Sequence, residues 1–165
     1  MASKSSIGYN SMDVLLQRKR QCTEKILEIK RAKKLTWEGI AEAVGRSPVW
    51  VTACCLGEAS MDEPAAQKLV EYLGETNCEI KQIIMQPGIK AQVPVGVLVQ
   101  DPCIYRLQEV TLVYGNTIKE LIQEKFGDGI MSAIDFKMEV EKEEDPAGDR
   151  VRIVMSGKYL PYKRW

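Results

Sequence analysis

The stretch from Gly127 to Val140 constrains the fold of this chain more than any other. After the Gly127-Asp128-Gly129 turn, apolar side chains stand at even positions, namely Ile130, Ile134, Phe136, Met138 and Val140. The odd positions from Asp135 to Glu139 are charged. A period of two is that of a β-strand with one buried face, not that of a helix. We therefore predict a strand whose even side chains are buried.

Ser132 is the one polar member of that predicted face. An unpaired buried hydroxyl costs roughly 1–3 kcal/mol, so Ser132 needs either a partner or a function. One interpretation is that it bonds to a neighbouring carbonyl group. The other is that it belongs to a binding or catalytic site.

A second strand is predicted after a charged turn over residues 141–149, which contains Pro146 and Gly148. Val151, Ile153 and Met155 alternate there with Arg152, Val154 and Ser156. An isolated two-stranded hairpin is marginal in water, and both of its edges remain open. Symmetric exchange of strands or helices between copies covers such edges. The sequence therefore predicts that this half of the chain oligomerises.

Two short helices are predicted before the strand. Leu107, Val110 and Tyr114 form the apolar stripe of the first, and Thr117 with Glu120 resembles a capping box that opens the second. Arg106 and Glu109 lie three residues apart, which places them on one helical face. A surface ion pair is one interpretation, since such pairs are common and individually weak. A functional pair is the other.

The N-terminal part has helical periodicity throughout. A first helix is predicted over residues 12–34, with a basic face that includes Arg18, Lys19 and Lys25 and is expected to be solvated. Further helices are predicted after Thr36, after Ser47-Pro48, from Met61 to Gly74 and from Glu79 to Met85. Together they predict a compact bundle of about five helices.

The helices on either side of Gly45 have the spacing of a helix-turn-helix motif. A helix that reads DNA presents Arg, Lys, Asn or Gln to the base edges. The second helix here offers Val49, Trp50, Val51 and other mainly apolar residues, with only Arg46 just before it. We therefore expect this helix to pack inside the bundle and do not expect nucleic acid as a partner.

Pro87, Gly88, Pro94 and Gly96 interrupt the helical pattern and predict an extended linker. The expected domains are a helical bundle over residues 1–86, a linker over 87–100 and a C-terminal domain over 101–165. This pattern assigns the chain to the α+β class.

The composition excludes several classes of chemistry. The chain has no histidine, which excludes histidine-based catalytic triads and histidine-ligated metals. Basic and acidic residues are equal in number, so no overall charge favours nucleic acid or acidic lipid. The five cysteines form no C-x-x-C pair, which indicates reduced thiols. With no long apolar stretch, no membrane association and a cytoplasmic location are expected.

The C-terminal half resembles the cyanase family (cyanate lyase, or cyanate hydratase). The resemblance is carried by Y-R-x-x-E-x-x-x-x-Y-G from Tyr105, by K-E-L-I-x-E-K-F-G-D-G-I-M-S-A-I-D-F-K from Lys119, and by G-K-Y-L-P from Gly157. It is collinear over residues 101–161. Over the first 90 residues it depends on the helical layout more than on motifs.

The resemblance implies a fold, a reaction and a site. The fold would be an N-terminal all-α, repressor-like bundle and a small C-terminal α+β dimerisation and catalytic domain with intertwined strands. The reaction would combine cyanate with bicarbonate to give carbamate and carbon dioxide, and the carbamate would then release ammonia. The family's catalytic residues fall on Arg106, Glu109 and Ser132. The resemblance also implies no metal, no organic cofactor and a decamer of five dimers.

Two other functions remain open at this point. The first is a helix-turn-helix DNA-binding regulator with a C-terminal oligomerisation or anion-sensing domain, which would not need Arg106, Glu109 or Ser132. The second is an assembly protein without activity that uses the same oligomeric core.

Overall fold

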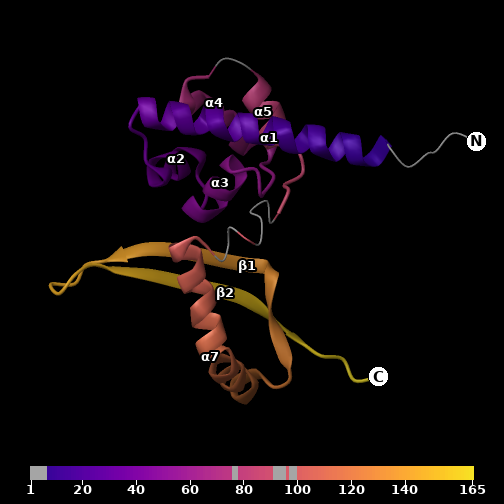
Figure 1. Cartoon of the computed structure of the whole chain (residues 1–165), viewed down its shortest axis with the longest axis vertical. Coiled ribbons are helices and arrows are strands. Elements are labelled where there is room, and N and C mark those ends of the chain that lie inside the picture. The colour runs from indigo at the N-terminus through magenta and orange to yellow at the C-terminus, as the bar shows by residue number, and fades with distance from the viewer. Residues whose placement is uncertain (1–6, 76–77, 91–95, 97–99) are drawn as a thin grey trace, which may run out of the picture. The chain divides into compact units, whose positions relative to one another are not determined.

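The computed structural model describes residues 7–75, 78–90, 96 and 100–165. The chain divides into two compact units, Met1–Gln92 and Val93–Trp165, which Figure 1 draws in indigo to magenta and in orange to yellow respectively. The division falls inside the segment that was predicted to be a linker.

Only part of the predicted linker can be compared with the structure. Residues 87–90 have no regular secondary structure, as predicted, and residues 91–95 and 97–99 lie outside the described part of the chain. Gly96 and Gln100 are helical. The prediction of an extended segment is therefore wrong at these two residues.

The first unit is all-helical, as predicted. Its helices are α1 (Ile7–Ala32), α2 (Trp37–Val44), α3 (Pro48–Cys55), α4 (Glu63–Leu73) and α5 (Cys78–Ile84). The long helix α1 runs across the unit (Figure 1) and contacts α3, α4 and α5, while α2 packs on α3 and α4. Each helix buries a side chain that is at most 1% exposed: Ile26, Ile40, Val51, Leu69 and Ile80.

The ends of the helices follow local chemistry. The Thr36 hydroxyl accepts a hydrogen bond from the Gly39 amide at 3.0 Å and so caps α2. Gly45 ends α2 in the left-handed conformation at φ 75°. Ser47 stands at the N-cap of α3, as predicted, but its side chain makes no capping bond. Pro48 is the first residue of α3 and has no N–H, so the N-terminus of α3 has one backbone donor fewer that needs a partner.

The expected solvation of the basic face of α1 is wrong at Lys19, which is only 2% exposed. Its ammonium group donates to the carbonyl oxygens of Ile83 at 3.3 Å and Gln86 at 3.1 Å. These carbonyls lie at the C-terminal end of α5, where a cation is favoured by the helix dipole. Lys19 is thus a buried cap of α5.

The second unit contains one long continuous helix, α7 (Pro102–Phe126), capped by the Asp101 carboxylate, which accepts from the Ile104 amide at 2.9 Å. The prediction of two short helices is wrong, because α7 runs straight through Gly115 and Thr117. A glycine inside a helix costs only about 0.5–1 kcal/mol relative to alanine. Breaking the helix there would instead leave several backbone groups without intrahelical partners.

A two-stranded antiparallel sheet completes the second unit. It consists of β1 (Gly129–Glu143) and β2 (Arg150–Pro161), both longer than predicted. The register is regular from Phe136 opposite Gly157 to Glu143 opposite Arg150. The connecting turn is held by Asp145, which accepts from the Ala147 amide at 2.8 Å and pairs with Arg150.

The predicted burial of the even face of β1 is largely wrong in the single chain. Ser132 is 6% exposed, Phe136 and Met138 are partly buried, and Ile134 is 98% exposed. An irregularity between Met131 and Phe136 shifts the strand register and interrupts the alternation between these two residues. A hairpin with one helix also has too little of its own surface to cover both faces.

Candidate active site

Arg106 and Glu109 form the ion pair that their spacing predicts. The Arg106 Nη1 atom lies 2.7 Å from Glu109 Oε2, on the N-terminal half of α7. The hydrogen bond with Glu109, and then its negative charge, raise the pKa of Arg106 above its ordinary value. Both side chains are exposed, at 69% and 40%. An exposed ion pair of this kind adds little stability. Its exposure leaves the guanidinium accessible to an anionic ligand.

Tyr105 extends this cationic position. The guanidinium carbon of Arg106 lies 5.6 Å from the centre of the Tyr105 ring. A planar guanidinium held beside an aromatic ring and one carboxylate keeps further N–H donors free. Arg106 can therefore bind a small planar anion through its remaining donors.

Ser132 is the one residue in the described part of the second unit that is classed as buried. Its Oγ accepts hydrogen bonds from the Ile134 amide at 3.1 Å and from the Asp135 amide at 3.0 Å. This differs from the simple expectation, in which the hydroxyl would donate to a neighbouring carbonyl. A serine hydroxyl has two acceptor positions and one donor. With both acceptor positions occupied, the O–H remains to be donated.

The irregularity in β1 creates this arrangement. Met131 pairs with Tyr159 and Phe136 pairs with Gly157, so residues 132–135 of β1 stand opposite Lys158 alone. The surplus residues form a tight turn around the Ser132 hydroxyl. Local serine-to-backbone bonds of this kind replace ladder bonds where a strand is interrupted. The alternation of apolar and charged residues in the sequence does not reveal that β1 has extra residues here.

The single chain assembles only part of the predicted site. Arg106 and Glu109 are bonded to each other, whereas, in the part of the chain that the structure describes, no hydrogen bond or ion pair joins either of them to Ser132. All three residues belong to the second unit.

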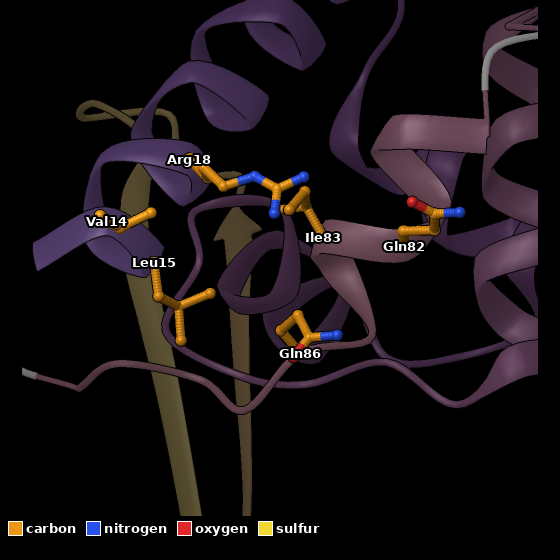
Figure 2. Close-up of a pocket in the computed structure, with 6 residues that line it drawn as sticks. All are labelled: Val14, Leu15, Arg18, Gln82, Ile83 and Gln86. Atoms are coloured by element: carbon orange, nitrogen blue, oxygen red, sulfur yellow. The ribbon is translucent and has the colours of Figure 1, made fainter. Parts of the chain in front are cut away.

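Two pockets among the described residues are lined by other side chains. One in the second unit is lined by the C-terminal half of α7 and the start of β1, including Ile118, Gln123, Asp128 and Ile130. Another, in the first unit, is lined by Val14, Leu15, Arg18, Gln82, Ile83 and Gln86, and Figure 2 shows the Arg18 side chain extended from α1 toward Ile83. Apart from Arg18, the residues that line this second pocket are uncharged. It therefore offers an anion contact but no acid, base or nucleophile.

The described residues offer neither a metal site nor a membrane span. They contain no group of three or more Cys, Asp or Glu side chains arranged to hold a metal ion. None of the helices there combines the length and the apolar character that crossing a membrane requires.

Comparisons with known proteins cover nearly the whole chain. The family described as "Cyanate lyase C-terminal domain" matches residues 96–164, and that described as "Cyanate hydratase, N-terminal" matches residues 19–87. A cyanate hydratase of Marinomonas sp. is 55% identical over 90% of this chain and 99% of its own length. One of Teredinibacter turnerae is 54% identical with the same coverage.

A solved structure agrees with these relatives. The crystal structure of cyanase from T. urticae superimposes with a TM-score of 0.77 at 33% identity, over 86% of this chain and 97% of that chain. These matches do not support a helix-turn-helix regulator. By sequence and by fold, the chain belongs to the cyanate lyase (cyanate hydratase) family.

Proposed function

We propose that this protein decomposes cyanate in a bicarbonate-dependent reaction that gives ammonia and carbon dioxide through carbamate. The observation that supports this most strongly is the identity of 55% with a cyanate hydratase over 90% of the chain. Cyanate and bicarbonate take up one proton to form carbamate and carbon dioxide. Carbamate takes up a second proton and breaks its C–N bond to release ammonia and another carbon dioxide.

Arg106 is proposed to bind the anionic substrates. Both reactants carry a negative charge, so bringing them together requires a fixed cation. Glu109 uses one side of the guanidinium at 2.7 Å, which leaves other N–H groups for an incoming oxygen or nitrogen. The hydrogen bond and the negative charge of Glu109 raise the pKa of Arg106, which favours the charged form of the guanidinium.

Ser132 is proposed to act as a hydrogen-bond donor and not as a nucleophile. The two amide N–H groups of Ile134 and Asp135 occupy the acceptor positions of its oxygen. An oxygen engaged in this way is a poor attacking group, whereas its own O–H is strengthened as a donor by the bonds it accepts. Such a donor, aimed at negative charge that develops on the substrate, stabilises the transition state.

Glu109 is proposed to fix the orientation of Arg106 and to assist proton transfer between bicarbonate and the cyanate nitrogen. Its ion pair with Arg106 supports the first role directly. The chain has no histidine, so a carboxylate is among the few groups left for the second role.

Positioning accounts for much of the expected rate acceleration. Holding two reactants in the correct geometry contributes roughly 7–11 kcal/mol toward lowering a barrier. Neither a covalent intermediate nor a metal or organic cofactor is needed in this proposal, and bicarbonate acts as the co-substrate.

The active form is proposed to be a homodecamer of five dimers with intertwined C-terminal units. Large apolar side chains of the second unit support an extensive interface: Leu112 is 80% exposed, Val151 77% and Ile134 98%. In a closed assembly, these side chains would be covered by other copies. Because no hydrogen bond or ion pair joins Ser132 to Arg106 or Glu109 among the described residues of one copy, each site is proposed to combine residues from more than one subunit.

The protein is proposed to work in the cytoplasm. All five cysteines are free thiols in the structure. Free thiols persist in a reducing compartment.

Steady-state ammonia release from cyanate plus bicarbonate tests the assigned residues. Arg106→Ala and Ser132→Ala are each expected to lower kcat/KM by about 10²–10³-fold, the typical loss when one oriented donor of a catalytic site is removed. Arg150→Ala, which removes an exposed and likewise ion-paired arginine at the start of β2, and Ser156→Ala, which removes an exposed hydroxyl from β2, are the matched controls. Full activity of the Arg106 and Ser132 variants would refute the assigned roles.

A further inference from the structure

Gly157 lies where β2 passes closest to the turn that holds Ser132. It pairs with Phe136, the first residue of β1 after the irregularity. The four residues that precede Phe136 include Ser132 and both amides that bond to its hydroxyl. Gly157 therefore lies at the end of the irregular segment of the sheet.

A side chain at Gly157 has no room. A Cβ atom there would meet the carbonyl oxygen of Ser132, lie 3.2 Å from the carbonyl carbon of Ser132, and lie 2.6 Å from Cγ of Met131. The methionine side chain can move aside, but the Ser132 carbonyl belongs to the backbone. A methyl group at position 157 must therefore displace the backbone of Ser132.

Close approach, and not an unusual backbone angle, selects glycine at this position. Gly157 is absent from the described glycines with positive φ, which are Gly45, Gly57, Gly74, Gly127 and Gly148. An L-residue could adopt its conformation without strain. In contrast, a methyl group added at Gly115 in the same unit would meet no described atom within 4 Å.

We propose that Gly157 is a positioning residue of the active site. Its lack of a side chain lets β2 lie against the Ser132 carbonyl and so holds the Ser132 hydroxyl in the orientation in which its proton is free to be donated. This inference rests on the proposed function of Ser132. It assigns no contact between Gly157 and the substrate.

The displacement expected from a methyl group is sufficient to affect catalysis. The Ser132 oxygen is fixed by two amides only two and three residues further along the chain. Moving the Ser132 backbone changes both bonds together. Misplacement of a catalytic group by about 1 Å can cost 10²-fold in rate.

A double-mutant cycle tests the proposal. Gly157→Ala, Ser132→Ala and the double variant are assayed for ammonia release as full-length assemblies, with Ser156→Thr as the control. That control adds one methyl group to the exposed neighbour of Gly157 in the regular part of the ladder. Gly157→Ala alone is expected to lower kcat by roughly 10–100-fold, and in the Ser132→Ala background by less than about twofold, because residues that act together are non-additive.

Hydrogen exchange gives a second measurement that does not depend on activity. The Ile134 and Asp135 amides, which donate to Ser132, are expected to exchange faster in Gly157→Ala and in Ser132→Ala than in the parent protein or in Ser156→Thr. Mass spectrometry of peptides that cover residues 130–138 follows this exchange. If the parent protein released no ammonia, the proposed function would fail, while the exchange result would still test the positioning.

Three results would overturn the inference. The first is a Gly157→Ala variant with activity within about twofold of the parent. The second is a double variant whose fold-loss in kcat equals the product of the fold-losses of Gly157→Ala and Ser132→Ala. The third is a Gly157→Ala chain that does not fold and assemble, since Gly157 would then be a requirement of the fold and not a positioning residue.

Discussion

At the scale of single residues, three cysteines in the first unit are shielded in the helical core. Burial raises the pKa of Cys22 and Cys54 to about 11 and that of Cys55 to about 12. The ammonium group of Lys19 partly opposes this shift at Cys22 and Cys54, while its own pKa is lowered by burial. These thiols stay protonated in the folded protein and therefore behave as small apolar groups.

The raised pKa of Cys55 predicts a loss of stability in alkali. An unfolded cysteine ionises near its ordinary pKa of 9.0, whereas folded Cys55 keeps its proton up to about 12. The stabilising contribution is therefore complete below pH 9 and is lost as the pH rises toward 12. In Cys55→Ala, the free energy of unfolding is expected to fall less between pH 8 and pH 10, by about 1 kcal/mol.

Urea unfolding of the full chain at the two pH values measures this difference. Fluorescence of Trp37 and Trp50 reports on the first unit, because both pack against its core. Cys78→Ala, at an exposed thiol, is the matched control and should follow the parent protein. Parallel losses in the parent and in Cys55→Ala would contradict the prediction.

At the scale of helices and strands, the two helices around Gly45 differ in how they begin. Thr36 caps α2 through a hydrogen bond from Gly39 at 3.0 Å, while Ser47 occupies the same position of α3 without such a bond. Thr36→Ala is therefore expected to destabilise the first unit by about 0.5–2 kcal/mol. Ser47→Ala, as the matched control, should change stability by much less, and equal losses in urea unfolding would show that the capping bond is not the cause.

Several elements could be predicted because residues close to their ends determine where they begin and end. Helices α2 and α4 each have a capping side chain at the start and a glycine in the left-handed conformation at the end. Such signals act within a few residues of each other and are visible in the sequence. The alternation after Gly127 likewise predicted β1, whose register with β2 is regular beyond Phe136.

Other elements could not be predicted because their cause is tertiary. Gly115 resembles a helix breaker, but α7 continues through it. Lys19 belongs to a basic face, and only the placement of α5 reveals that its ammonium group has carbonyl partners. The turn around Ser132 depends on how β2 pairs with β1, which the alternation of β1 alone does not specify.

Part of the local geometry around the three candidate residues could be predicted from the sequence. The spacing of Arg106 and Glu109 predicted their ion pair, which the structure contains. The buried position of Ser132 was also predicted, whereas its bonds from two amides were not. The catalytic assignment of the three residues stays a prediction.

At the scale of the whole molecule, the second unit leaves large apolar side chains exposed in a single copy. Helix α7 has no buried residue, and Ile134 of β1 is 98% exposed. Surfaces of this kind are covered in an assembly or cause aggregation. The proposed sharing of Ser132 and Arg106 between copies would give such an assembly a catalytic purpose as well as a structural one.

Mixing two inactive variants tests whether the site is shared between subunits. Arg106→Ala chains keep Ser132, and Ser132→Ala chains keep Arg106, so a mixed assembly can contain sites in which both residues are intact. Co-refolded or co-expressed mixtures are expected to recover up to roughly a quarter of the parent activity, the statistical share if each residue comes from a different copy. Each variant alone is the control, and a mixture no more active than either would place the whole site in one chain.

The rate of ammonia release from cyanate, measured as bicarbonate is added to carbonate-depleted buffer, tests the proposed reaction most directly. The rate is expected to be close to the uncatalysed background without bicarbonate and to rise to saturation as bicarbonate is added, because the proposed first step consumes bicarbonate. Ammonia release at the same rate without bicarbonate, or none at all from a folded and assembled protein, would contradict the proposed function.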